Sequence, residues 1–99
     1  MRQSVIPDKG KEGFMDKKLY NIKRSFLRLN DKIFKGYFSY GEEREELQLQ
    51  MKASTTVGEI YHMGEELLEY LQSDGEYYDR DQIADVTMWL WRWKEYKAA

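Results

Sequence analysis

The chain has 99 residues, of which 41% are apolar, 15% aromatic and 34% charged, and its net charge is −2. This length suits one domain with one modest core. The sequence contains no cysteine, which excludes disulfide bonds, thiolate metal sites and cysteine nucleophiles. No apolar stretch approaches the roughly 18 residues of a membrane span, and the first residues lack the apolar core of a signal peptide. We therefore expect a cytoplasmic protein without membrane contact.

Charge is distributed unevenly along the chain. Residues 1–36 carry ten Lys and Arg against four Asp and Glu, whereas residues 37–99 carry six against fourteen. Such a split indicates either a nucleic-acid contact in the first third or a basic segment that lies against acidic helices of its own domain. Residues 1–14 are polar and are predicted to form a flexible arm. Residues 15–99 are predicted to form a single globular domain.

The part of the domain before residue 53 has an ambiguous pattern. Between residues 17 and 29 the apolar side chains fit the spacing of a helix and also that of a strand. The segment 32–52 carries stronger strand signals, because it begins with β-branched and aromatic residues and then alternates polar and apolar side chains from Glu46 to Lys52. We predict a β-hairpin over 32–52, joined by a third strand or a helix from 17–29.

The rest of the chain has the pattern of two helices. Thr56 and Glu59 have the spacing of a capping box, in which each side chain bonds a backbone amide at the other position. Apolar residues at helical spacing then predict a helix over 56–72, and Gly75 suits the left-handed turn that follows a helix. A second apolar stripe predicts a helix over 80–97.

The expected fold class is therefore α+β. An N-terminal antiparallel hairpin or three-stranded meander would pack on a C-terminal two-helix hairpin. An all-α bundle is the runner-up. A strand over residues 86–93 is also an alternative, because alternation would place three Trp residues on one face.

Carboxylates gather in the two predicted helices. Glu66 and Glu69 are i,i+3 neighbours on one helix face, and Asp85 of the next helix could approach them in a helical hairpin. Three carboxylates on an inner face would form a hard oxygen site suited to Mg²⁺. The alternative is that Glu65, Glu66 and Glu69 form the solvated face of an amphipathic helix.

The sequences E-E-L-L-E, from Glu65 to Glu69, and Q-I-A-D, from Gln82 to Asp85, resemble the motifs of the MazG-like nucleotide pyrophosphohydrolases. The resemblance covers about residues 58–93. That family is all-α, with an E-E-x-x-E helix and a later E-x-x-D helix that together hold Mg²⁺. The resemblance implies that the three glutamates of the first motif and the aspartate of the second bind the metal. Gln82 stands where the family motif has its Glu, which removes one ligand charge.

Aromatic residues are abundant, with eight Tyr, four Phe and three Trp. On a helix, the three Trp side chains would spread over more than half of the circumference, so at least one should be exposed. Exposed Trp, Tyr and Arg are the usual anchors of protein interfaces. The alternative is a central helix that is contacted on several sides. The predicted partner-binding residues are Trp89, Trp91, Trp93, Arg92 and Tyr96.

Basic and aromatic residues are mixed in the segment 17–40. Basic grooves with stacking aromatic rings hold single-stranded nucleic acids without reading their sequence. The same aromatic residues are equally suited to a core. The predicted basic patch comprises Lys17, Lys18, Lys23, Arg24, Arg28, Lys32 and Lys35.

These features predict first a small, non-enzymatic protein-interaction module that regulates or inhibits a host or partner protein. Its composition resembles that of small proteins of bacteriophages and mobile elements. The alternative is a Mg²⁺-dependent, MazG-like nucleoside-triphosphate pyrophosphohydrolase with a degenerate motif. A nucleic-acid-binding protein that uses segment 17–35 is third. The first function needs no cofactor, and a homodimer is compatible with it.

Overall fold

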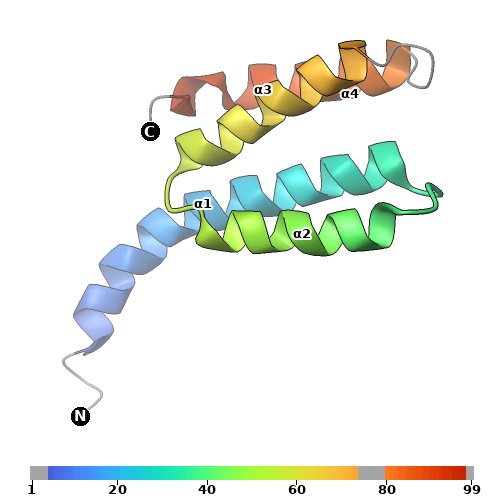
Figure 1. Cartoon of the computed structure of the whole chain (residues 1–99). Helices are drawn as coiled ribbons and strands as arrows, with labels where there is room; N and C mark the ends of the chain where they lie inside the picture. Colours follow the sequence, from blue (N-terminus) through green and yellow to red (C-terminus); the bar gives the residue numbers. More distant parts are fainter. Residues whose placement is uncertain (1–4, 74–79, 98–99) are drawn as a thin grey trace.

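The computed structural model describes residues 5–73 and 80–97, and their fold is an all-helical bundle (Figure 1). One layer holds α1 and α2, which lie side by side, and the other holds α3 and α4. α1 is central, because it packs against all three other helices. The elements are α1 (Val5–Phe34), α2 (Tyr40–Ala53), α3 (Val57–Ser73), α4 (Arg80–Trp93) and a short 3-10 helix, η1 (Lys94–Tyr96).

The predicted α+β fold is wrong, since the described residues contain no strand, and the runner-up all-α bundle is observed. Of the predicted arm, residues 1–4 lie outside the described residues and residues 5–14 begin α1, so the flexibility of this segment stays a prediction. The predicted turn at Gly75 also lies outside them. None of the helices in the described ranges has the length and apolar character needed to cross a membrane.

α1 is a helix because its apolar residues share one face. Ile22, Phe26, Leu29 and Ile33 follow one another at spacings of three and four residues, and all four are buried. The β-branched and aromatic residues near its end therefore continue the helical stripe and do not start a strand. α1 ends before Gly36, whose positive φ of 93° favours glycine.

The predicted hairpin over 32–52 is replaced by the end of α1, a turn and α2. The alternation of Leu47, Leu49 and Met51 suggested a strand with one apolar face. On the helix, however, Leu47 and Met51 are i,i+4 neighbours that turn inward, whereas Leu49 is exposed. Glu, Gln, Leu and Lys, which dominate the segment, are strong helix formers.

The predicted start of α3 is confirmed. The Glu59 backbone amide donates to Thr56 Oγ1 at 3.2 Å, and the Thr56 amide donates to Glu59 Oε1 at 2.9 Å. This reciprocal pair forms the capping box and satisfies two amides at the helix start. The bonds that Glu59 accepts from the backbone amides of Thr56 and Thr55 lower the pKa of its carboxyl group.

α3 and α4 meet where a ring fits against a glycine. Trp89 of α4 is only 7% exposed and lies against Gly64 of α3. A Cβ atom at position 64 would overlap the Trp89 ring and lie 3.1 Å from Leu90 Cδ2. The same ring tilts against Phe26 of α1 at a centroid distance of 5.1 Å, and its indole N–H donates to Ser25 Oγ at 2.9 Å.

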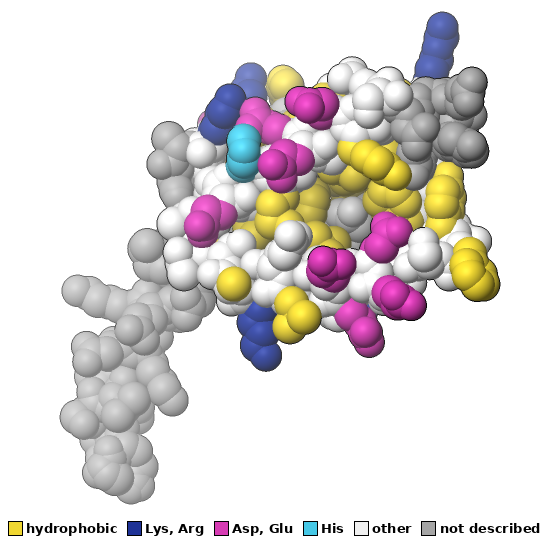
Figure 2. Space-filling view, in the orientation of Figure 1, with side chains coloured by type: hydrophobic (Ala, Val, Ile, Leu, Met, Phe, Trp, Pro, Cys, Tyr) yellow, Lys and Arg dark blue, Asp and Glu magenta, His cyan; other side chains and the backbone are white. Residues whose placement is uncertain are grey.

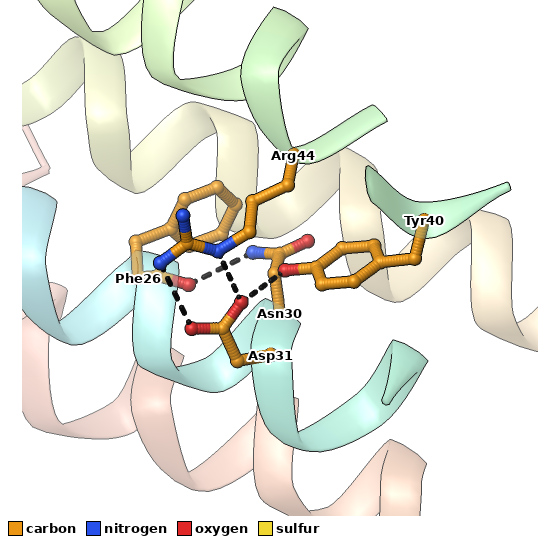
Figure 3. A network of polar contacts seen from close by, with 5 residues as sticks. All are labelled: Phe26, Asn30, Asp31, Tyr40 and Arg44. Carbon is orange, nitrogen blue, oxygen red and sulfur yellow. Dashed lines mark hydrogen bonds and ion pairs between the residues drawn. The ribbon is translucent and has the colours of Figure 1, made fainter. Parts of the chain in front are cut away.

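A polar network joins α1 to α2 (Figure 3). Arg44 Nε donates to Asp31 Oδ1 at 2.8 Å, and the Tyr40 hydroxyl donates to the same oxygen at 2.5 Å. The hydrogen bond from Arg44 lowers the pKa of Asp31, with a further contribution from Tyr40. Burial and the neighbouring Asp31 carboxylate raise the pKa of Tyr40.

Replacement of Gly64 by alanine tests the contact between α3 and α4. We expect Gly64→Ala to lower the free energy of unfolding by about 1–3 kcal/mol, because the added methyl group must displace a buried indole ring. Urea denaturation measures this change. Gly41→Ala is the matched control, since a Cβ there meets open space. An equal response of the two variants would contradict the fitted contact.

Replacement of Asp31 by asparagine tests the polar network. Since the folded-state pKa of Asp31 is lowered, its stabilisation is present above about pH 4 and is lost as the pH falls through the folded-state pKa. Asp31→Asn should therefore lower the melting temperature at pH 7, and its difference from wild type should shrink towards pH 2. Thermal melts across this range measure it, with Glu45→Gln as an exposed control on α2. A difference that does not vary with pH would refute the ionic contribution.

Candidate functional site

The outer side of α4 carries two large apolar side chains that face solvent. Met88 and Trp91 are i,i+3 neighbours, and each is 70% exposed. Ala84, one turn before Met88, is exposed as well. These three residues form what we call the α4 outer surface. The Lys94 ammonium group lies 5.2 Å from the centroid of the Trp91 ring, within cation–π distance.

The three Trp residues of α4 have different environments. Trp89 is buried in the core, Trp93 is half-buried with its ring 5.7 Å from that of Tyr96, and Trp91 faces solvent. The expectation that at least one Trp is exposed is confirmed by Trp91. Arg92 is exposed beside it. Of the predicted partner-binding residues, the structure therefore places Trp91 and Arg92 on the surface and Trp89 in the core.

The carboxylates of the first acidic motif contact basic groups or face solvent. Glu65 accepts a hydrogen bond from Lys97 at 3.1 Å and lies 3.1 Å from His62 Nδ1. These two partners, Lys97 first, lower the pKa of Glu65. Glu66 and Glu69 are exposed. This arrangement is that of a solvated helix face.

The second acidic motif is tied to α1. Asp85 forms an ion pair with Lys32 at 3.2 Å, and the Gln82 side-chain amide donates to the Ile33 carbonyl at 3.2 Å. Within residues 5–73 and 80–97, no three or more His, Cys, Asp or Glu side chains form a group that could hold a metal ion. In the described structure, Gln82 and Asp85 thus hold α4 against α1.

The residues of the predicted basic patch lie on α1 or directly after it, and three of them contact other parts of the domain. Lys32 pairs with Asp85, Lys23 donates to the Ser54 carbonyl at 3.0 Å, and Lys18 lies 4.8 Å from the Tyr96 ring. These three contacts attach α1 to other parts of its own domain. The remaining four residues of the predicted patch are exposed and are separated by seven, four and seven residues. They are Lys17, Arg24, Arg28 and, just after the helix, Lys35.

The sequence did not lead us to predict Met88 of the α4 outer surface or Lys94, which lies against the Trp91 ring. Met88 lies three residues before Trp91, and Lys94 lies three residues after it. Because residues three apart are neighbours on a helix, this spacing could have identified both. Trp89 was predicted to bind a partner, but its ring is buried.

Magnesium tests the metal-binding prediction. We expect millimolar MgCl₂ to leave the melting temperature unchanged relative to NaCl of equal ionic strength, because Glu65 and Asp85 are already paired with lysines. A ligand that binds only the folded state would raise it. A rise caused by Mg²⁺ and abolished by Glu69→Gln would contradict this expectation and support the MazG-like function, which stays a prediction.

Comparisons with known proteins assign no family to this chain. No protein-family model matches the chain, and neither a curated protein nor a solved structure shows significant similarity to it.

Proposed function

We propose that the protein is a small, non-enzymatic protein-interaction module that regulates or inhibits a partner protein. The observation that supports this function is the exposure of Met88 and Trp91 side by side on α4. Trp, Met and Arg are enriched in protein interfaces, and Trp most often provides the binding energy.

The core of the bundle does not need these two side chains. Val86, Trp89 and Leu90 supply the buried face of α4, and all three pack in the hydrophobic core. Met88 and Trp91 therefore leave apolar area in water that a partner could cover, with a gain of about 25 cal/mol per Å². Such an arrangement favours binding over a purely structural role.

The charges around Trp91 indicate the chemistry of the partner. Arg92 follows it directly, Lys94 lies three residues after it, and both are exposed. The Lys94 ammonium group lies against the Trp91 ring. The partner is therefore expected to offer an apolar pocket for the indole, bordered by Asp or Glu side chains. Opposite charges at the rim of an interface guide association and fix its orientation.

Site-specific crosslinking in the cells that naturally make the protein tests this function. A photoreactive amino acid at position 88 should crosslink to one partner, because that position lies inside the proposed interface. Trp91→Ala should abolish this product while the far-UV circular dichroism spectrum stays unchanged, since the ring contributes little to the core. Leu49→Ala is the matched control, because Leu49 is similarly exposed but lies on α2.

Two results would contradict the proposal. One is a crosslinked product of equal yield from wild type and Trp91→Ala. The other is a product that consists of two copies of this chain, which would make the α4 outer surface a homodimer contact.

A further inference from the structure

An apolar depression lies between α2 and α3, away from the α4 outer surface. Figure 2 shows a face that is hollowed between these helices, with hydrophobic side chains at its floor and acidic side chains at both edges. The hollow has a volume of about 290 Å³. We call it the α2–α3 groove, and its apolar lining comprises Phe34, Tyr40, Leu47, Leu67 and Tyr70.

The groove exists because α2 packs against α1 and has no comparable packing with α3. Phe34 and Leu67 at the floor are buried, whereas Leu47 is half-buried and Tyr70 is 50% exposed. Apolar area is thus left accessible on both walls. The groove continues past Gln50 into a second, adjoining hollow that Met63 and Glu66 also line.

The charges at the groove are acidic. Glu43 and Glu46 of α2 are exposed and line it. The adjoining hollow carries both charges, because exposed Glu66 lines it together with His62 and Lys97. None of the described residues that line the α2–α3 groove itself is Lys or Arg. The nearest arginine in the sequence, Arg44, is turned towards Asp31 of α1. An occupant with positive charges beside an apolar stripe is therefore complementary to this groove, and an anionic lipid or a nucleic acid would be repelled.

The shape of the groove suits a helix. Its wall on α2 runs from Glu43 to Gln50, which is two helical turns or about 10 Å. Helices bind in such grooves through apolar residues at positions i, i+3, i+4 and i+7. A helix placed there would contact α2 and α3 together and fill the space that these two helices leave open.

We propose that the α2–α3 groove binds an amphipathic helix of a partner protein, with apolar residues on one face and Lys or Arg on both sides of that face. This extends the proposed interaction function, because it adds a second surface and specifies its ligand. The α4 outer surface favours an acidic partner surface and the α2–α3 groove a basic helix. The two surfaces can therefore be tested independently.

Two fluorescent peptides of about 18 residues, long enough to form a helix, provide the probes. One has Leu on one face and Lys on the other, and the second has Glu in place of Lys. Fluorescence anisotropy should show binding of the Leu–Lys peptide, weakening as salt is added, and no binding of the Leu–Glu peptide. Absence of binding by the Leu–Lys peptide at low salt would overturn the proposal.

Two charge-reversal variants locate the site. Glu43→Lys/Glu46→Lys changes the groove edge, whereas Glu42→Lys/Glu45→Lys makes the same change in net charge at exposed positions of α2 that do not line the groove. We expect the first pair to weaken Leu–Lys peptide binding by about tenfold and the second by about twofold or less. Equal weakening by both pairs would mean non-specific attraction to an acidic protein and would overturn the proposal.

Methyl signals of ¹³C-labelled methionines show where the peptide lies. The Met63 signal should shift on binding and the Met88 signal should not, since Met63 lines the continuation of the groove and Met88 lies on α4. A shift of the Met88 signal without a shift of the Met63 signal would overturn the proposal. Trp91→Ala should leave peptide binding unchanged, so failure of the groove and failure of the α4 outer surface can be told apart.

Analytical ultracentrifugation of the free protein tests whether a second copy of this chain occupies the groove. We expect the mass of a single chain for wild type and for Glu43→Lys/Glu46→Lys. A wild-type dimer that this pair of substitutions dissociates would place a second copy in the groove and would overturn the proposal.

Discussion

The insertion of the Trp89 ring between α3 and α1 is the contact on which the arrangement of the bundle depends. The ring comes from α4, lies against Gly64, is stacked on Tyr61 at a centroid distance of 6.2 Å and tilts against Phe26. Its indole N–H is satisfied by Ser25 of α1. Because one large side chain of α4 contacts both α3 and α1, a change in the rotation or spacing of any of these three helices disturbs the others.

This contact also determines which side chains of α4 face solvent. Successive residues of an α-helix are rotated by about 100°, so Trp91, two residues after Trp89, points in nearly the opposite direction. Because the Trp89 indole is buried in the core, the Trp91 indole faces solvent. Met88, which precedes Trp89 by one residue, lies on the same outer side as Trp91. The α4 outer surface is thus a geometric consequence of how α4 is held.

α2 is held differently from the other helices. Its contacts are with α1, through Met51 and Leu47 on the apolar side and through the bonds of Tyr40 and Arg44 to Asp31. Few apolar residues are left to cover α3, and the carboxylates on the facing sides of α2 and α3 have like charge. The α2–α3 groove follows from this composition.

The uneven charge of the sequence is partly balanced inside the domain. Lys32 and Lys97 pair with the acidic helices through Asp85 and Glu65. Lys32 belongs to the basic segment, so its pair with Asp85 agrees with the expectation that this segment lies against acidic helices of its own domain. The ion pairs are partly exposed, so they contribute little stability. Their main effect is that Asp85 and Glu65 have a basic neighbour.

The local sequence pattern was sufficient to predict α3 and α4 as helices. Their apolar stripes have helical spacing, and the Thr56–Glu59 capping box is a local device whose bonds form within four residues. It also determined that the three Trp residues could not all be buried, because their angular spread on a helix is a property of the helix alone.

The conformation of α2 and the position of the α2–α3 groove depend on contacts between helices. The alternation of Leu47, Leu49 and Met51 fits a strand, whereas Leu47 and Met51 alone also fit one face of a helix. Packing of these two residues into the hydrophobic core resolved the choice. The α2–α3 groove also depends on tertiary structure, because it forms only where α2 and α3 are neighbours that do not pack closely against each other. Likewise, Trp91 and not Trp89 is the exposed Trp because Gly64 of another helix leaves room for the Trp89 ring. Local patterns specify helices and caps, whereas the side that each helix buries depends on contacts between residues far apart in the chain.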